Sequence, residues 1–192
     1  MYYNATEVPV LRDIVLKNRS YRRFYQDVAI ELETLRELVD LARLSPSAAN
    51  RQALKYILSS DPEKNALIYP NIRMDGNPPE GERPSGYVII LEDTAIKLIL
   101  ACDYGIAAQT IHLGAVEKGL GGCMIGNVDR NGLRKALDIP AQYEILLVLA
   151  LGKPIETMVI EPVGEDGATQ QWWDNDRVRH VPKRSLDDII VG

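Results

Sequence analysis

DYGIAAQTIHLGAVEK, residues 103–118, has the pattern of one helix with an apolar middle. Asp103 suits the N-cap at its start, and Gly119 suits the position just after its end. From Ile106 to Val116 no side chain carries a formal charge when the histidine is neutral. Because a helix that is apolar almost all round is buried, we expect this one in the core, against another subunit, or against both.

Three short apolar stretches elsewhere in the chain are predicted strands. KYILSS (55–60), GYVIIL (86–91) and EILLVLALG (144–152) are rich in β-branched and aliphatic residues. Such runs are typical of strands that are buried on both faces. A sheet of this kind needs helices on its two sides, so the pattern indicates an α/β or α+β three-layer sandwich.

Apolar residues recur at helical spacing in several segments between these strands. The predicted helices cover residues 8–17, 30–44, 62–70 and 130–137, the last of them capped by Asp129. The stretch PNIRMDGNPPEGERPSG (70–86) holds too much proline, glycine and charge for either a helix or a strand. We therefore predict a long loop there, of the kind that often serves as a lid or a specificity element.

Composition narrows the possible classes of protein. The 192 residues are enough for one sizeable core, so we expect a single domain. A formal net charge of −5 argues against general nucleic-acid binding, which needs several phosphates to be neutralised. No apolar run is long enough to span a bilayer and no secretory signal precedes the first helix, so we expect a soluble cytoplasmic protein.

The two cysteines and two histidines do not form a metal-binding pattern. Cys102 and Cys123 have neither a CxxC arrangement nor histidines at ligand spacing, so we predict no metal site and two buried, reduced thiols. His112 lies in the apolar helix and is expected to be a satisfied core residue. His180 is assigned no role, and no catalytic acid or base is identified.

The stretch NRSYRRF (18–24) gathers three arginines around one serine in this acidic chain. In an extended segment alternate side chains share a side, so Ser20 and Arg22 can converge on one group while Arg23 points away. A hydroxyl beside a guanidinium matches the oxygens of a phosphate. On these residues alone, a solvated basic loop is an equally good interpretation.

Two further stretches offer ligand contacts. SPSAANRQ (45–52) combines a proline and small residues with two side-chain amides, which suit a planar polar ring, although a simple turn is the more common meaning of such a stretch. GLGGCMIGNVDR (119–130) has four glycines within eight positions, which let main-chain N–H groups approach a ligand. It follows a helix and lacks the GxGxxG spacing, so a dinucleotide-binding Rossmann site is disfavoured.

The three stretches, in this order and spacing, resemble the nitroreductase family of flavoproteins. The resemblance also includes GERPSGYVIIL, DYGIAAQTIHLGAVEKGLGGC, ALGKP (150–154) and VPKRSLDDIIV, so nearly the whole chain takes part. It implies an α+β fold, a three-layer α/β/α sandwich with a mostly antiparallel mixed sheet. It also implies a homodimer that binds noncovalent FMN at the subunit interface, with residues from both chains in each site.

The resemblance assigns roles to particular residues. The FMN phosphate would be held by Arg19, Ser20 and Arg22, with help from Lys183 or Arg184. The isoalloxazine or ribityl region would be lined, from the partner subunit, by Pro46, Ser47, Ala48 and Asn50. The backbone around Met124, Ile125 and Gly126 would face the flavin ring. Residues 165–192, with Trp172 and Trp173, are expected to wrap the partner subunit.

The implied activity is a hydride transfer from NADH or NADPH through flavin N5 to a small oxidised acceptor, such as a nitroaromatic compound or a quinone, in a ping-pong cycle. Two alternatives remain at this point. One is an FMN-binding or anion-binding sensor or carrier without turnover. The other is a family member with a different flavin-dependent reaction, a choice that we expect the 70–86 loop to encode.

Overall fold

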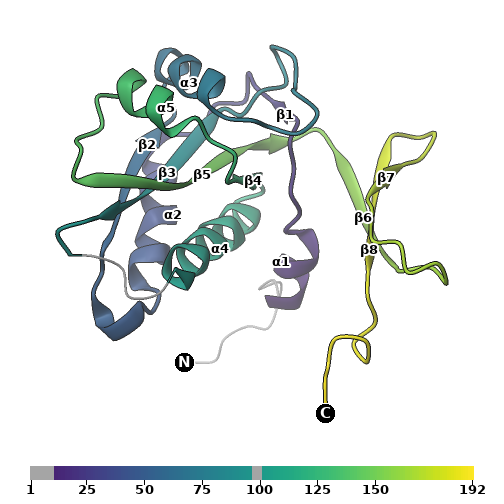
Figure 1. Cartoon of the computed structure of the whole chain (residues 1–192). Coiled ribbons are helices and arrows are strands. Elements are labelled where there is room, and N and C mark those ends of the chain that lie inside the picture. The colour runs from purple at the N-terminus through teal and green to yellow at the C-terminus, as the bar shows by residue number, and fades with distance from the viewer. Residues whose placement is uncertain (1–10, 97–100) are drawn as a thin grey trace, which may run out of the picture. The chain divides into compact units, whose positions relative to one another are not determined.

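The computed structural model describes residues 11–96 and 101–192 (Figure 1). Of the predicted helix 8–17, the part from Leu11 onward forms α1 (Leu11–Lys17), and residues 8–10 lie outside the described range. The chain divides after Pro154 into two compact units, which are described separately below. A single domain over residues 1–192 stays a prediction.

The first unit is built on one five-stranded sheet with the order β1-β5-β3-β2, and β4 also pairs with β5. Every strand pairing in it is antiparallel, and a single parallel bridge joins Ser20 to Gly122. This confirms the expected α+β fold with a mostly antiparallel sheet. The strands are β1 (Phe24–Tyr25), β2 (Leu54–Ser59), β3 (Gly86–Asp93), β4 (Gly121–Ile125) and β5 (Tyr143–Pro154).

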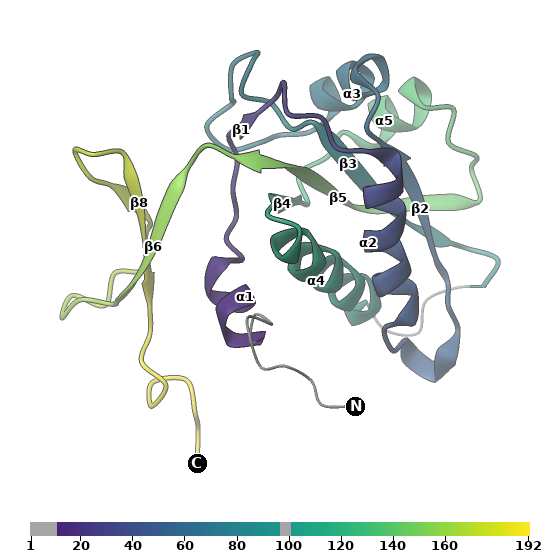
Figure 2. The same ribbon diagram turned by 180° about the vertical axis from the view of Figure 1, so that it is seen from behind.

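Helices lie on both faces of this sheet (Figure 2). One face packs against the pair α2 and α4, whereas residues around α3 and α5 cover the other. The helices are α2 (Leu32–Leu44), α3 (Pro62–Ile68), α4 (Cys102–Glu117) and α5 (Arg130–Ala136), and two 3₁₀ turns, η1 (Ala48–Asn50) and η2 (Tyr69–Asn71), follow α2 and α3. Asp129 caps α5 as predicted, accepting a 2.9 Å hydrogen bond from the Gly132 N–H.

Strand β3 shows why the central strands have no polar alternation. Tyr87 and Ile89 point into the core beneath α3 and α5, while Val88 and Ile90 point into the core beneath α2 and α4. Both side-chain sets are almost fully buried. The prediction of two buried faces is correct for β3 but not for β2, because β2 is the edge strand and most of its residues are only half-buried.

Helix α4 occupies the predicted position, with one correction at its start. Gly119 follows its end with a φ of +71°, as expected for the residue after a helix. The N-cap is Ala101, however, and the Asp103 side chain caps nothing in its own helix. Gly114 allows close packing, because a Cβ there would collide with the side chains of Leu38 and Leu41 in α2.

The second unit, residues 155–192, is a small three-stranded sheet. Its strands are β6 (Thr157–Pro162), β7 (Trp172–Trp173) and β8 (Val178–Lys183). β6 pairs with β8 in parallel, and β7 pairs with β8 antiparallel. Val181 is buried, but several large apolar side chains of this unit are exposed.

Among the residues that the structure describes, none of the helices is both long and apolar enough to cross a membrane.

Candidate functional site

The basic segment, residues 18–24, lies against the glycine-rich strand β4. Ser20 forms a parallel bridge with Gly122, and the Tyr21 N–H donates to the Gly122 carbonyl at 3.0 Å. The segment then enters the sheet through Phe24, which is fully buried and pairs with Pro154. The fold therefore brings together two of the three stretches that the sequence singled out.

The three arginines of the basic segment point to different partners. Arg22 stays beside Ser20, because its Nη1 donates to the Ser20 carbonyl at 3.2 Å. Arg23 points elsewhere and pairs with Glu82 at 3.1 Å. Arg19 turns back and donates from Nη2 to the Val15 carbonyl at 2.7 Å.

Arg19 also has an unpaired donor. Its Nε is buried and has no hydrogen-bond partner within the described residues. Desolvation by burial lowers the pKa of the Arg19 guanidinium, and the charge of Tyr21 acts in the opposite direction. A buried N–H without a partner is costly, so this donor is suited to a ligand acceptor.

The 70–86 loop is fastened to the basic segment. The Glu82 carbonyl accepts from the Phe24 N–H at 2.9 Å, and the Gln26 Oε1 accepts from the N–H groups of Gly81 and Arg83. Asp75 lies 3.9 Å from the Arg22 guanidinium. The predicted loop thus reaches Arg22, one of the cations that were assigned to a phosphate.

The glycines Gly121 and Gly122 of strand β4 allow close packing within the protein, and their predicted approach to a ligand stays a prediction. A Cβ at Gly121 would collide with the Tyr21 ring, and a Cβ at Gly122 would collide with the Ala150 carbonyl. Both glycines are buried. Gly126 is different, since it is exposed and a Cβ there would meet nothing within 4 Å.

The residues assigned to the flavin ring differ in exposure. Met124 is 40% exposed, whereas the Ile125 side chain is buried in the core beneath α3 and α5. The accessible surface at this end of the strand is thus formed by Met124 and Gly126.

Residues 47–52 form a strained turn. Ala49, Asn50 and Gln52 all have positive φ angles, of 49°, 52° and 53°. Residues other than glycine adopt this conformation at a cost of about 1 kcal/mol or more each, and such strain gathers at functional sites. Within the turn, the Ser47 Oγ accepts from the Gln52 N–H at 3.3 Å.

The strained turn is held from outside by helix α4. The buried Asp103 carboxylate has both oxygens 3.2 Å from the Ala48 N–H. Just before the turn, the hydroxyls of Ser45 and Thr110 lie 3.0 Å apart. Helix α4 thereby holds the segment that was assigned to the flavin ring, through Asp103 in its first turn and Thr110 in its middle.

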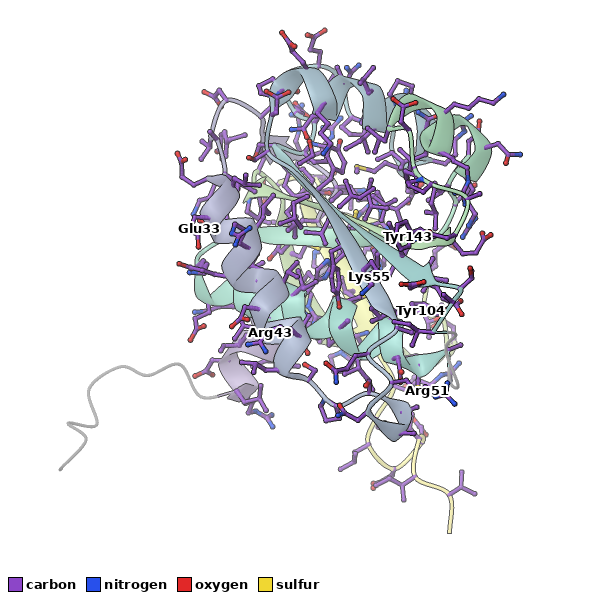
Figure 3. All side chains as sticks on the ribbon, turned by 90° about the vertical axis from the view of Figure 1, so that its left-hand side faces the viewer. Glu33, Arg43, Arg51, Lys55, Tyr104 and Tyr143 are labelled. Atoms are coloured by element: carbon purple, nitrogen blue, oxygen red, sulfur yellow. The ribbon has the colours of Figure 1, made fainter. Side chains whose placement is uncertain are left out.

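A cavity of about 210 Å³ adjoins the strained turn. Figure 3 views this side of the first unit, with Arg43 on α2, Lys55 on β2 and Arg51 labelled. Burial raises the pKa of Tyr56, one of the lining residues, to about 12, so its phenol stays protonated. The lining comes from the end of α2, the turn, β2 and α4, namely Ala42, Arg43, Ser45, Pro46, Ser47, Gln52, Leu54, Lys55, Tyr56, Asp103 and Ala107.

The strained turn and the basic segment lie at opposite ends of α4. The turn is bonded to Asp103 in the first turn of the helix, and the basic segment is bonded to Gly122, just beyond its other end. Because α4 spans 16 residues and a helix rises 1.5 Å per residue, these ends are about 24 Å apart. One chain does not bring the two predicted groups of ligand residues together.

The second unit contains Lys183 at the end of β8 and Arg184 just after it, both exposed. It also contains a cluster that the sequence did not reveal. His180 Nδ1 lies 2.7 Å from Glu161 Oε2, and His180 Nε2 lies 3.2 Å from Asp174 Oδ2. Trp172 stacks on the His180 ring at 3.8 Å and donates to Glu161 at 2.8 Å.

His112 in α4 is buried as predicted, but it is not fully hydrogen-bonded. Its Nε2 has no hydrogen-bond partner among residues 11–96 and 101–192. Burial lowers the pKa of His112 to about 4.

The two cysteines differ in exposure. Cys123 is buried, whereas Cys102 is exposed as the first residue of α4, contrary to the expectation of two buried thiols. Within the described residues, no group of histidines, cysteines and carboxylates could hold a metal ion.

Comparison with known families identifies the chain. The sequence model of the nitroreductase family matches residues 15–85 and 86–153, which is most of the first unit. The chain belongs to the nitroreductase family. The basic segment, the strained turn and the glycine-rich strand all lie within the matched residues, so the predicted family resemblance is confirmed.

Individual nitroreductase relatives agree with this assignment. The chain is 28% identical over 166 residues to a Bacillus subtilis protein named FMN reductase (NADPH), covering 74% of this chain but only 65% of that enzyme. It is 26% identical over 196 residues to a Rhodospirillum rubrum 5,6-dimethylbenzimidazole synthase, covering 86% of this chain and 90% of the synthase. A nitroreductase family protein from Streptococcus pneumoniae has the same fold, with a TM-score of 0.73 at 16% identity, covering 95% of this chain and all of that one.

Proposed function

We propose that this nitroreductase family member is an FMN-dependent oxidoreductase that uses NADH or NADPH to reduce a small oxidised acceptor. The observation that carries the proposal is the pairing of the basic segment with β4, because it sets Ser20 against the glycine-rich strand at Gly122, and the backbone just beyond that strand is exposed at Gly126. The relative named FMN reductase (NADPH) supports both the cofactor and the reductant.

The residues of the basic segment fit a flavin phosphate. Arg19 offers a buried Nε without a partner in the described chain, Ser20 is exposed, and Arg22 holds its guanidinium beside Ser20. Guanidinium and hydroxyl donors are well matched to phosphate oxygens. Lys183 or Arg184 would add a further cation from the second unit.

The chain's own task is to bind and orient the cofactor. Bound FMN supplies the redox chemistry, taking a hydride from NAD(P)H and passing reducing equivalents to the acceptor. Main-chain groups around Met124, Ile125 and Gly126 would lie against the ring. The strained turn and the preceding Pro46 would face the isoalloxazine or ribityl part, through Pro46, Ser47, Ala48 and Asn50. This half-reaction requires no acid or base from the protein.

The proposed site is shared between two copies of the chain. Helix α4, about 24 Å long, separates the basic segment from the strained turn, and this separation favours a site in which one flavin contacts the basic segment of one chain and the strained turn of the other. We therefore propose a homodimer of three-layer α/β/α subunits with two FMN sites at the interface. In this arrangement residues 165–192 wrap the partner subunit.

The direct test is to purify the protein with added FMN, measure the dissociation constant by flavin fluorescence, and add NADH or NADPH without oxygen. We expect a yellow protein that one or both nicotinamides bleach, and a nitroaromatic compound or a quinone should then restore the colour. A protein with no affinity for FMN would refute the proposal. Bound FMN that neither nicotinamide reduces would instead favour a sensor or carrier.

A second candidate is supported by the match to 5,6-dimethylbenzimidazole synthase, which extends over 90% of that enzyme. We propose it as the alternative reaction on the same site. Incubating the FMN-loaded protein with a reductant and oxygen, followed by mass spectrometry for 5,6-dimethylbenzimidazole, separates the two. Formation of that product would favour the synthase, and its absence together with acceptor reduction would favour the oxidoreductase.

A further inference from the structure

Asp103 is a buried carboxylate whose bonding partner is not in its own helix. It is 4% exposed and lies in the first turn of α4, yet the N-cap of that helix is Ala101. Its two oxygens share the Ala48 N–H at 3.2 Å. Burying a carboxylate is costly unless it is hydrogen-bonded, so this bond accounts for the placement of Asp103.

The strained turn requires such an anchor. Most of the hydrogen bonds around residues 47–52 are local, including Asn50 N–H to the Ser47 carbonyl at 2.9 Å and Gln52 Nε2 to Asn50 Oδ1 at 3.3 Å. Left-handed backbone at three residues persists only where the surroundings impose it. The Asp103 bond ties the turn to a different element through a buried group, whereas the bond from Arg51 to the Ile96 carbonyl comes from an exposed side chain.

The same contact shapes the cavity wall. Asp103, Pro46 and Ser47 line the cavity together, so the anchor lies in the same cavity wall as residues assigned to the flavin ring. Loss of the anchor would let the turn relax toward ordinary dihedral angles and would move these residues. A binding surface that must be re-formed on binding loses affinity.

We propose that Asp103 is a positioning residue that holds the strained turn in the shape that receives the isoalloxazine ring. The proposal rests on the proposed FMN-binding function. Asp103 acts through Ala48 and the turn and is not itself a ligand of the flavin.

The test compares Asp103→Ala with Asp103→Asn in the full-length protein, using FMN and riboflavin as probes. Riboflavin has the same ring but no phosphate, so a ring-positioning role affects both flavins alike. Asp103→Ala should raise the dissociation constants of both about tenfold, equivalent to about 1.4 kcal/mol, and should shift the visible absorption spectrum of the bound flavin. Asp103→Asn keeps an acceptor oxygen and should stay within about threefold of the natural protein.

A matched control separates positioning from general destabilisation. His112→Ala alters another buried polar residue of α4, one that lies outside the proposed site. It should lower the melting temperature while leaving both flavin affinities and the spectrum unchanged. If Asp103→Ala is insoluble, Asp103→Ser carries the same expectation, because its short side chain cannot reach the Ala48 N–H.

The outcomes distinguish this inference from the proposed function. If the natural protein does not bind FMN, the proposed function fails. If the natural protein binds FMN and the Asp103→Ala or Asp103→Ser variant keeps its affinities and spectrum, the positioning role of Asp103 is wrong. If these variants lose FMN affinity but keep riboflavin affinity, Asp103 acts on the phosphate end, and the proposal is also wrong.

Discussion

The two ends of helix α4 present two different kinds of binding surface. Beyond its C-terminal end, the extended basic segment displays guanidinium groups beside β4. At its N-terminal end, a strained turn without glycine is held by one buried carboxylate. The first surface can recognise a ligand by charge and the second by shape, as a molecule with a phosphate at one end and a planar ring at the other requires.

The largest loss of FMN affinity from a single substitution is expected in the basic segment, beyond the C-terminal end of α4. Arg22→Ala removes charge-assisted hydrogen bonds worth about 1.5–3 kcal/mol, so the dissociation constant for FMN should rise about 10- to 100-fold. Riboflavin affinity should barely change, because riboflavin lacks the phosphate. Titration of apoprotein with both flavins measures this difference.

Arg23→Ala is the matched control for Arg22→Ala, since Arg23 lies one position away and pairs with Glu82. It should leave FMN affinity within about twofold. If the Arg22→Ala variant kept full FMN occupancy under dilution, Arg22 would not be a ligand of the FMN phosphate.

A smaller loss of flavin affinity is expected from Asn50→Gly in the strained turn, at the N-terminal end of α4. Glycine adopts the φ of 52° without strain, so this change removes the side-chain amide while the backbone is preserved. Loss of a neutral hydrogen bond of about 1 kcal/mol should weaken FMN and riboflavin binding equally, about fivefold, without lowering the melting temperature.

The control for Asn50→Gly is Asp138→Gly. Asp138 is an exposed residue with a φ of 50° outside the proposed site. The Asp138→Gly variant should show any gain in melting temperature that glycine gives at a positive φ, but no loss of flavin affinity. Equal flavin affinities for the two variants would show that the Asn50 side chain has no role in binding.

The smallest expected effect is a pH-dependent change in the stability of the second unit. This unit carries Lys183 and Arg184, of which one was assigned to the FMN phosphate. A hydrogen bond to Glu161, with a further one to Asp174, raises the pKa of His180, although its partial burial acts in the opposite direction. The stabilisation is therefore fully present below the ordinary histidine pKa of about 6.5 and is lost as the pH rises through the folded value. Residues 155–192 should become more susceptible to limited proteolysis as the pH is raised through this range.

His112, the other histidine of the chain, predicts the opposite pH dependence of stability for the first unit. Burial lowers the pKa of His112 to about 4, so the core loses stability as the pH falls from about 6.5 toward that value. With only two histidines in the chain, NMR titration of their ring protons resolves both pKa values. His180→Gln should abolish the upper titration, and two values near 6.5 would contradict the described environments.

Much of the fold could be predicted from apolar runs, because strands buried on both faces and an uncharged helix are visible locally. The convergence of the Ser20 and Arg22 side chains on one ligand group stays a prediction, because the bond between these residues involves the Ser20 backbone carbonyl. The role of Asp103 was not, because its partner Ala48 is 55 residues away and an acidic residue at a helix start indicates a cap. His180 was missed for the same reason, as Glu161 lies 19 residues away on another strand.

The measurement that tests the shared site most directly is complementation between two variants. Arg22→Ala weakens FMN binding through the basic segment, and replacing both Ser47 and Asn50 with glycine weakens it through the strained turn. When the two variants are mixed by unfolding and refolding, random pairing should restore FMN binding of natural affinity to about one quarter of the sites, because half of the dimers are mixed and each mixed dimer has one intact site. No recovery above the separate variants, under conditions in which refolded natural protein regains FMN, would contradict a site shared between two chains.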